Sequence, residues 1–431
     1  MKIPSVKGFH DVLPGESCRW AWIEQRARRV LDGYGFSEIR IPIVERAELF
    51  SRSIGDTTDI VEKEMYTFTD RDGSTLTLRP EGTASVVRAY VEHAIAQQEP
   101  VSKVFYLGPM FRRERPQKGR LRQFSQIGVE VIGRDDAAID ADVLLLLYDL
   151  LIALHVRDPQ IELNSLGCAE CRPAYRVTLL SFGEAHHAAL CANCTRRLER
   201  NPLRLLDCKD PACHAATADA PAMLDHLCGA CRGHFDTVRA LIEREGVPHR
   251  LNPRMVRGLD YYVRTAFEVT AEGLGAQGAV GGGGRYDGLV RDLGGPDVAG
   301  VGFALGVERL LLSMAEHAGT TARHPEVFLA PVGTAGEAEA VHLAHRWRRD
   351  GIRVELANGG RSLKSQMRLA DKAGAPIVLI VGDDELSAHA LTVRDMRAKR
   401  DFPRAIDLTA SGAVLRDTLA HLTQHPVEQH T

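Results

Sequence analysis

The sequence lacks an apolar run of signal-peptide length at its start and an apolar run of membrane-helix length anywhere. Residues 1–16 contain no such run, and the most apolar stretch, Val143–Leu154, is too short for a bilayer and includes Asp149. We therefore expect a cytoplasmic protein that does not enter a membrane. Because thiols stay reduced in that compartment, the nine cysteines are not interpreted first as disulfides.

The sequence also lacks a strong net charge, internal repeats and low-complexity segments. A net charge of −3 creates no overall basic field, so contact with a nucleic acid would depend on local basic patches. The proportions of hydrophobic residues (44%) and charged residues (26%) are those of an ordinary soluble globular protein. A length of 431 residues is too great for one ordinary core, so we expect two or three domains.

Patterns of apolar residues divide the chain into four parts. Residues 1–165 combine helices and strands, residues 166–246 alternate helical segments with paired cysteines, and residues 247–320 return to strands. After a linker at residues 315–325, residues 325–431 alternate strand and helix, which favours a small α/β domain with a largely parallel sheet. The sequence therefore predicts an α+β chain with a helical insertion and a separate C-terminal domain.

Two segments have an ambiguous pattern. Residues 38–44 alternate like a strand, but Pro42 inside them favours an edge or a break. Residues 273–288 are rich in glycine, and Gly281–Gly284 permit close approach of the backbone to a ligand. A flexible loop is the alternative for these glycines.

Two strands predicted at residues 103–111 and 123–132 carry the most informative pattern. Because strand side chains alternate between faces, Gln126, Gly128 and Glu130 share one face, and the aliphatic residues between them form an apolar surface on the other. Gly128 leaves room for a ligand between an amide and a carboxylate. Oxygens of both groups accept hydrogen bonds from ammonium or imidazole N–H groups, so this face suits a small zwitterion or cation.

The turn between these strands, residues 112–122, is rich in arginine. A solvated hairpin tip also carries such charge, and this interpretation is reasonable for Arg113 and Arg122. Arg112 instead belongs to the strand face with the polar row, where its guanidinium can hold phosphate oxygens bidentately.

Several segments resemble known motifs, and they occur in the expected order. Residues 111–117 (FRRERPQ) resemble the motif-2 hairpin of class II aminoacyl-tRNA synthetases, and residues 302–309 (GFALGVER) resemble their motif 3. Residues 40–42 fit the motif-1 strand, which forms the dimer interface in that class. Residues 257–262 (RGLDYY) and 283–288 (GGRYDG), together with 78–83 (LRPEGT), are similar to segments of the histidyl-tRNA synthetase family.

This resemblance covers essentially the whole chain and implies a fold and a reaction. The fold is an antiparallel catalytic sheet flanked by helices, an insertion that clamps the tRNA acceptor arm and a C-terminal α/β domain for the anticodon. The reaction is the activation of L-histidine with ATP and Mg²⁺ to histidyl-adenylate, followed by transfer to the 3′-terminal ribose of tRNA(His). Members of the family are homodimers.

The resemblance also implies which residues bind histidine. They are Glu81, Gly82, Thr83, Gln126, Glu130, Tyr261 and Tyr262. Glu81, Thr83 and Gln126 would hold the α-amino group, and Glu130 and Tyr262 would contact the imidazole. From the sequence pattern alone, Glu81 is equally explained as a charge at a helix N-terminus, and the two tyrosines as packing residues.

The same resemblance assigns residues to ATP. Arg112 and Arg257 are the two catalytic cations on the α-phosphate, where preorganised guanidinium groups stabilise the charge that gathers during attack. Glu114 is carried over to the adenine, Arg309 to the adenine face and the γ-phosphate, and Arg120 to the neighbourhood of the phosphates. A surface salt bridge is the alternative for Arg257, and a helix-surface cation for Arg309. Finally, the turn residues Arg115 and Gln117 would contact the tRNA acceptor end.

Eight cysteines form four pairs in the insertion, and three of the pairs are C-x₂-C. The pairs are Cys168/Cys171, Cys191/Cys194, Cys208/Cys213 and Cys228/Cys231. The first two pairs are 19 residues apart, which fits a zinc pattern in which each pair supplies half of a tetrahedral site. We expect structural Zn²⁺ in one or two sites of open pairing, with His214 as an alternative ligand. Buried free thiols and disulfides are the alternatives.

Two other functions share part of this pattern. The histidine-binding regulatory subunit of ATP phosphoribosyltransferase has the same catalytic fold but usually lacks the C-terminal domain and catalytic residues. A module that only binds tRNA would not need amino-acid and phosphate residues together. The presence of Arg112, Arg257, Arg309 and residues 327–431 argues against both.

Overall fold

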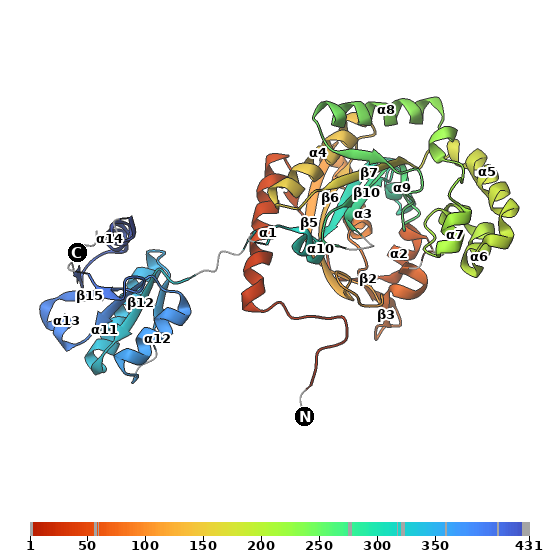
Figure 1. Ribbon diagram of the computed structural model, residues 1–431. Coiled ribbons are helices and arrows are strands. Elements are labelled where there is room, and N and C mark those ends of the chain that lie inside the picture. Colours follow the sequence, from red (N-terminus) through yellow and green to blue (C-terminus); the bar gives the residue numbers. More distant parts are fainter. Residues whose placement is uncertain are drawn as a thin grey trace. The chain divides into compact units, whose positions relative to one another are not determined.

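The computed structural model describes residues 3–55, 58, 60–274, 278–316, 318–319, 324–357, 360–402 and 405–424. The chain divides into two compact units, Met1–Thr320 and Thr321–Thr431 (Figure 1). The linker predicted at residues 315–325 lies partly outside the described residues.

The first unit is built on a sheet of eight strands in the order β1-β5-β6-β11-β10-β9-β7-β8. Its strands are β1 (Ser37–Glu38), β5 (Ser102–Phe111), β6 (Gln123–Ile132), β7 (Gln160–Ser165), β8 (His249–Leu251), β9 (Val263–Thr270), β10 (Ala279–Arg285) and β11 (Gly300–Gly306). The six central strands pair antiparallel, whereas β1 pairs with β5, and β7 with β8, in parallel. This sheet confirms the predicted antiparallel catalytic fold.

Helices surround this sheet, and a small sheet β2-β4-β3 adjoins them. The helices are α1 (Pro14–Gly33), α2 (Ala47–Ile54), α3 (Thr83–Glu92), α4 (Ala137–Ala153), α5 (Cys171–Ala185), α6 (Ala192–Arg200), α7 (Pro211–Ala216), α8 (Gly229–Arg244), α9 (Leu289–Asp292) and α10 (Val307–Ser313). The small sheet comprises β2 (Val44–Arg46), β3 (Tyr66–Thr69) and β4 (Thr75–Leu78). Helices α5 to α8 follow β7 and precede β8, which confirms the helical character predicted for the insertion (Figure 1).

The two faces of the large sheet have different roles. Ile127, Val129 and Val131 of β6 are fully buried in a core shared with α1, α4 and α8. Burial of such a side chain contributes about 1.5–3 kcal/mol, so this face holds the helices. The intervening residues of β6 point to the opposite face. The alternation predicted for the hairpin is therefore confirmed.

Within the glycine-rich segment, Gly281–Gly284 lie in a strand and not in a flexible loop. Gly281–Gly284 belong to β10, which lies between β11 and β9. A Cβ at Gly281 would lie 2.2 Å from the carbonyl oxygen of Ala304, and one at Gly283 would lie 2.0 Å from that of Gly302. The glycines are therefore needed because the neighbouring backbone is so close, and the flexible-loop alternative is wrong.

The strand predicted at residues 38–44 is interrupted, as Pro42 suggested. Strand β1 ends at Glu38 and β2 begins at Val44. The carbonyl oxygens of Ile41 and Pro42 accept hydrogen bonds from Nη1 of the buried Arg79, at 2.7 and 3.2 Å. A buried side chain thus replaces the strand partners that this segment lacks.

The second unit has a mixed sheet with parallel strands β13-β12-β14 and antiparallel β15 to β17. Its elements are β12 (Val327–Pro331), α11 (Gly333–Arg349), β13 (Val354–Leu356), α12 (Leu363–Ala373), β14 (Ile377–Val381), α13 (Asp383–Ala388), β15 (Ala390–Asp395), β16 (Arg400–Asp401), β17 (Ile406–Asp407) and α14 (Gly412–Gln424). Trp347 of α11 is fully buried, and its indole N–H donates to the carbonyl oxygen of Ala410 at 2.9 Å.

Among the helices that the structure describes, none has both the length and the apolar character needed to cross a membrane.

Candidate active site

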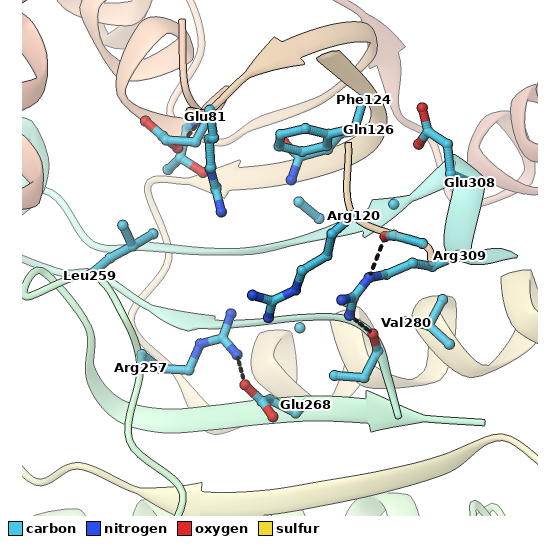
Figure 2. A pocket seen from close by; sticks show the side chains of 18 of the residues that line it. Glu81, Arg120, Phe124, Gln126, Arg257, Leu259, Glu268, Val280, Glu308 and Arg309 are labelled. Carbon is cyan, nitrogen blue, oxygen red and sulfur yellow. Dashed lines mark hydrogen bonds and ion pairs between the residues drawn. The ribbon is translucent and has the colours of Figure 1, made fainter. Parts of the chain in front are cut away.

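A cavity of about 270 Å³ opens on the polar face of the large sheet (Figure 2). The predicted site residues that line it are Glu81, Thr83, Arg112, Glu114, Arg120, Gln126, Arg257, Tyr261, Tyr262 and Arg309. They come from β6, α3 and the residues just before it, α10, the turn between β5 and β6, and the segment before β9. Gly82, Glu130, Arg115 and Gln117 are not part of its described lining.

Arg257 enters the cavity from the segment before β9. Its Nη1 donates to the Glu268 carboxylate at 2.7 Å, and its guanidinium carbon lies 5.3 Å from the centre of the Tyr262 ring (Figure 2). Its Nε is buried and has no hydrogen-bond partner among the described residues. One edge of the guanidinium is thus fixed by Glu268 and the ring, while a donor remains for a ligand.

Arg112 is held by neutral groups. Its Nε donates to the carbonyl oxygen of Pro80 at 2.8 Å, and its guanidinium carbon lies 5.3 Å from the centre of the Phe124 ring. The carboxylate of Glu114 is 4.0 Å from Nη1 and lies closer to Arg120, at 3.1 Å. Arg112 thus shares Glu114 with Arg120 at a long distance, and its guanidinium lines the cavity, where its planar fork could hold phosphate oxygens.

Arg309 of α10 is oriented by backbone oxygens. Its Nε donates to the carbonyl oxygen of Gly119 at 3.1 Å, and its Nη1 donates to that of Ala279. Burial lowers the pKa of Arg309, and the neighbouring charge of Arg120 lowers it further. Figure 2 shows Arg120, Arg257 and Arg309 directed toward the same space. An anion with several charges would relieve their mutual repulsion.

Glu81 is bound to the start of α3. Its carboxylate accepts the backbone N–H groups of Thr83 and Ala84 at 2.7 and 2.9 Å. This is the helix-terminus role that the sequence left open. Burial raises the pKa of this carboxyl group, and Glu81 also lines the cavity. A carboxylate has about four acceptor positions, so capping leaves capacity for a ligand.

Glu130 lies beneath the cavity surface and is 1% exposed. Its Oε1 accepts the Thr83 hydroxyl and its Oε2 accepts the Tyr286 hydroxyl, each at 2.6 Å. Burial raises the pKa of Glu130 to about 8. Both oxygens are thus already engaged with neutral donors of the protein.

Gly128 makes room for a side chain and not for a ligand. Strand pairing places Tyr106 directly opposite Gly128. A Cβ at Gly128 would lie 2.0 Å from Cζ of Tyr106, and one at Gly82 would lie 2.2 Å from the same atom. The prediction that a ligand occupies this gap is therefore wrong, because a cross-strand aromatic ring fills the space above a glycine.

Gln126 is the clearest sign that the cavity receives a polar ligand. Its Oε1 is buried without a hydrogen-bond partner among the described residues, although the residue lines the cavity (Figure 2). An unsatisfied buried acceptor costs about 1–3 kcal/mol. A ligand that donates an N–H group would remove that cost.

Comparisons with known proteins agree with this geometry. The model of the family described as histidyl-tRNA synthetase matches residues 8–310, and that of an anticodon binding domain matches residues 326–411. A "Histidine--tRNA ligase" of Geobacter metallireducens is 53% identical over 95% of this chain and 98% of its own. One from Geobacter sulfurreducens is 54% identical over 91% and 95%.

The chain belongs to the histidyl-tRNA synthetase family. The solved structure of the apo histidyl-tRNA synthetase of S. aureus matches 98% of this chain and 99% of its own, with a TM-score of 0.79 and 33% identity. The chain is therefore an aminoacyl-tRNA synthetase, a ligase of class II fold.

The motif-2 turn of this synthetase leaves two predicted residues on the outside. The side chains of Arg115 and Gln117 are exposed. The turn closes where Gln117 and Arg120 exchange backbone hydrogen bonds of 3.0 and 2.9 Å. Arg120 lines the cavity, whereas Arg115 and Gln117 are not part of its described lining.

Four site residues of the synthetase had no role predicted from the sequence. Tyr106 fills the gap at Gly128, Tyr286 donates to Glu130, Phe124 stacks on Arg112, and Glu268 fixes Arg257. Tyr286 belongs to the segment 283–288, whose similarity to the histidyl-tRNA synthetase family could have indicated that Tyr286 lies at the site. The other three gave no signal, because their contacts depend on strand register and on the path of residues 254–262.

The cysteines of the synthetase's insertion form two clusters. The first cluster is Cys168, Cys171, Cys228 and Cys231, and the second cluster is Cys191, Cys194, Cys208 and Cys213. Within each, the sulfur atoms lie within 4.8 Å of one another. The pairing suggested by the 19-residue spacing is therefore wrong, because the fold brings the first pair to the fourth and the second to the third. His214 is not part of either cluster.

Proposed function

We propose that this chain activates L-histidine with ATP and transfers it to the 3′-terminal ribose of tRNA(His), with Arg112 and Arg257 acting on the α-phosphate. One observation carries the proposal. The two guanidinium groups line the same cavity as the buried, unpartnered oxygen of Gln126. A zwitterionic amino acid and a polyphosphate need that combination.

The histidine subsite is proposed around Gln126. Its free oxygen would accept the α-ammonium group, together with Glu81 and the hydroxyl of Thr83. Tyr262 would contact the imidazole, with Tyr261 shaping the pocket. Glu130 would accept a hydrogen bond from the imidazole N–H by sharing the oxygens that accept the Thr83 and Tyr286 hydroxyls. A site that hydrogen-bonds a substrate N–H rejects analogues without it by about 10⁴–10⁵.

The nucleotide subsite is proposed around the arginines. A carboxylate oxygen of histidine attacks the α-phosphorus, the bond to the bridging oxygen breaks, and pyrophosphate leaves. Arg112 and Arg257 would stabilise the charge on the equatorial oxygens during this step. Glu114 would contact the adenine, as the family resemblance implies. Arg309 would contact the face of the adenine and the γ-phosphate, and Arg120 would lie near the phosphates.

Mg²⁺ is expected with ATP on its β- and γ-phosphates, because this ion prefers phosphate oxygens, carboxylates and water. Carboxylates of the type it binds line the cavity at Glu268 and Glu308. Glu308 accepts the backbone N–H of Ser125 at 2.9 Å, and burial raises its pKa to about 7. A bound cation would favour the ionised form of Glu308.

The tRNA is proposed to contact three parts of the chain. The exposed Arg115 and Gln117 would meet the acceptor end, residues 166–246 would clamp the acceptor arm, and residues 325–431 would bind the anticodon. Residues 1–165 and 247–320 would form the catalytic domain. Structural zinc in the insertion would hold that part together and take no part in the chemistry.

We propose that the chain forms a homodimer and that the small sheet β2-β4-β3 is part of the interface. Ile43 and Val44, next to the motif-1 segment, are 44% and 41% exposed, and Phe68 of β3 is 45% exposed. Apolar side chains grouped on one exposed sheet favour burial in an interface. We also place the protein in the cytoplasm.

The decisive experiment is ATP–pyrophosphate exchange measured with each amino acid in turn. We expect ATP–pyrophosphate exchange with histidine and with no other amino acid. We also expect the enzyme to attach histidine to tRNA(His). A regulatory subunit would bind histidine without exchange, and a tRNA-binding module would bind tRNA without it. Either outcome would overturn the proposal.

A further inference from the structure

We infer that each cysteine cluster binds one Zn²⁺, and that the two sites together position residues 254–264 from both ends. This segment carries Arg257 and Tyr262 into the cavity. The inference rests on the proposed function, because it takes these two residues to act on ATP and histidine.

The sulfur geometry fits zinc in both clusters. Four thiolates at about 2.3 Å from Zn²⁺ form a tetrahedron with edges of about 3.8 Å. The Cys168 sulfur lies 3.6 Å from that of Cys171 and 3.9 Å from that of Cys228. In the second cluster, the sulfurs of Cys191 and Cys208 are 3.7 Å apart. A disulfide would need sulfurs at about 2.05 Å, so these separations match the edges of a metal site.

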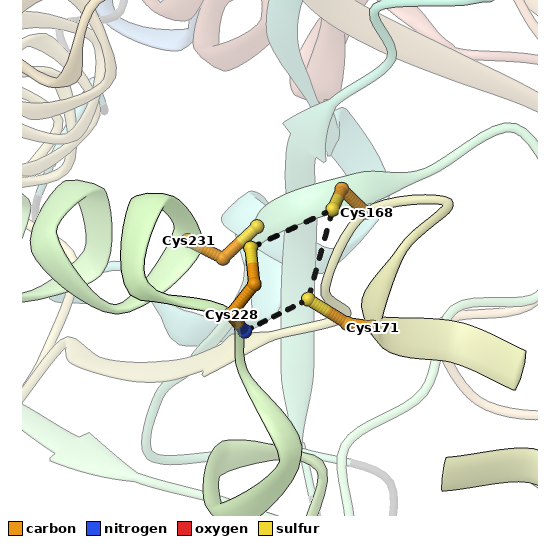
Figure 3. Close-up of side chains that lie close together, drawn as sticks. All are labelled: Cys168, Cys171, Cys228 and Cys231. Carbon is orange, nitrogen blue, oxygen red and sulfur yellow. Dashed lines mark hydrogen bonds between the residues drawn. The ribbon is translucent and has the colours of Figure 1, made fainter. Parts of the chain in front are cut away.

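The first cluster joins the start of the insertion, at Cys168 and Cys171, to the start of its last helix, at Cys228 and Cys231. Figure 3 shows four sulfurs directed toward one another from the start of α5 and the start of α8. Cys171 and Cys231 are 3% and 1% exposed. The backbone N–H of Cys228 donates to Cys171 Sγ at 3.1 Å. Such a hydrogen bond stabilises a metal-bound thiolate and orients the ligand.

This first cluster is directly connected to the C-terminal end of the segment. Arg172 follows Cys171 in the chain, and its Nη2 donates to the carbonyl oxygen of Tyr262. The backbone N–H of Arg264 donates to the carbonyl oxygen of Gly167 at 2.9 Å, immediately before the cluster begins. A fixed first cluster therefore fixes the backbone on both sides of residue 263.

The second cluster is connected to the N-terminal end. Arg254 donates to the carbonyl oxygen of Leu206, 3.3 Å away, and to the hydroxyl oxygen of Thr217, 3.0 Å away. That Thr217 hydroxyl donates in turn to the carbonyl oxygen of Cys213 at 3.0 Å. Leu206 precedes the ligand Cys208 by two positions. Loss of either metal would thus release one end of the segment, and a displacement of about 1 Å near reacting groups can cost about 10² in rate.

Zinc content and pairing are tested first, by metal analysis of the purified full chain and of two double variants. The wild type should contain about two zinc ions, one for each tetrahedral site. Cys171→Ser/Cys231→Ser should keep one, because both residues belong to the first cluster. Cys171→Ser/Cys194→Ser should keep none. Either of two results would overturn the inference. The first is a wild type that contains no zinc and has titratable thiols. The second is a Cys171→Ser/Cys231→Ser variant without zinc together with a Cys171→Ser/Cys194→Ser variant that keeps one zinc ion.

Positioning is tested with variants that leave all eight cysteines in place. Arg172→Ala should keep both zinc ions and raise the KM for histidine by about tenfold or more, with little change in the KM for ATP. Arg172→Lys should restore part of the loss. Arg232→Ala is the matched control, because Arg232 follows the ligand Cys231 but donates to Leu224 inside the insertion.

Two results would overturn the positioning role. One is an unchanged KM in Arg172→Ala, and the other is an equal effect of Arg232→Ala. Failure of the proposed function has a different signature, since Arg257→Ala would then keep full exchange activity whatever the zinc content.

Discussion

The hydroxyl of Thr83 donates to the carboxylate of Glu130 at 2.6 Å, although the two residues are 47 positions apart in the chain. The second oxygen of that carboxylate accepts the Tyr286 hydroxyl. Hydrogen bonds from these neutral donors lower the pKa of Glu130, but burial is the larger effect and raises it to about 8. This arrangement makes the stability of the free enzyme depend on pH.

The pH dependence has a definite sign. The unfolded chain ionises Glu130 near its ordinary pKa of about 4.3, whereas the folded chain holds the proton up to about pH 8. The stability from this group is therefore fully present below about 4.3 and is lost as pH rises through the folded pKa. Urea unfolding of wild type and Glu130→Gln from about pH 5 to about pH 9 should show the wild type losing stability relative to the variant. A difference that stays constant over this range would contradict the raised pKa.

Removal of either phosphate arginine should slow adenylation. Arg112→Ala and Arg257→Ala should each lower the rate of histidine-dependent exchange by about 10²–10³. Arg257→Lys should recover little, because lysine lacks the planar fork that Glu268 and the Tyr262 ring hold in place. The exposed Arg291→Ala is the control and should behave as wild type. Full activity in Arg257→Ala would exclude its assigned role.

The unpartnered oxygen of Gln126 predicts a selective effect on amino-acid binding. A hydrogen bond to a charged group contributes about 1.5–3 kcal/mol, so Gln126→Ala should raise the KM for histidine by about 10- to 100-fold. The KM for ATP should change little. Steady-state exchange kinetics measure both constants, and equal increases in the two would point to a general loss of structure instead.

Gly128→Ala tests the contact between the paired hairpin strands. The added Cβ would lie 2.0 Å from the Tyr106 ring, and such overpacking costs about 1–3 kcal/mol. Gly233→Ala in α8 is the matched control, because a Cβ there has no neighbour within 4 Å. That control should stabilise the chain by about 0.5–1 kcal/mol. Urea unfolding gives both values, and a smaller loss for Gly128→Ala in a Tyr106→Leu background would confirm the cause.

Asp140 joins three elements of the first unit. Its buried carboxylate accepts Nε of Arg285 from β10 at 3.0 Å and faces Nε2 of His234 from α8 at 2.7 Å. Asp140→Asn leaves the buried Arg285 with only Asp287, 2.9 Å away, as a charged partner, so we expect a loss of about 3 kcal/mol in unfolding free energy, at the low end for breaking a buried pair. The exposed pair Arg291–Asp297 serves as the control, and Asp297→Asn should cost about 0–1 kcal/mol. Similar losses in the two variants would refute the role of burial.

The hairpin was largely predictable from the sequence because its signal is local. Alternation along residues 123–132 determines which side chains share a face, and the structure follows it. The occupant of the Gly128 gap was not predictable, because it depends on the register that pairs Tyr106 with that position. The same limit applies to Glu268, whose contact with Arg257 depends on the path of a loop.

The cysteine pairing and strand β10 show a second limit. Spacing along the chain favours a metal site built from cysteine pairs that are neighbours in the sequence. The fold instead joins the first pair with the fourth and the second pair with the third. The cysteines of the second cluster therefore lie in the sequence between the two halves of the first cluster. In β10, Gly281–Gly284 carry no side chains, so no apolar alternation exists that could indicate a strand. Only the backbone on either side identifies it as part of the sheet.

The buried indole of Trp347 has a practical consequence. The chain has three tryptophans, and the other two, Trp20 and Trp22, lie in the first unit. Because Trp347 is fully buried and hydrogen-bonded to Ala410, unfolding of the second unit should expose its indole to water and change its fluorescence. In Trp347→Phe, the remaining tryptophan fluorescence comes only from Trp20 and Trp22 of α1. Comparing the fluorescence of this variant with that of the wild type during thermal unfolding therefore separates the unfolding of the two units, and no dye needs to be attached.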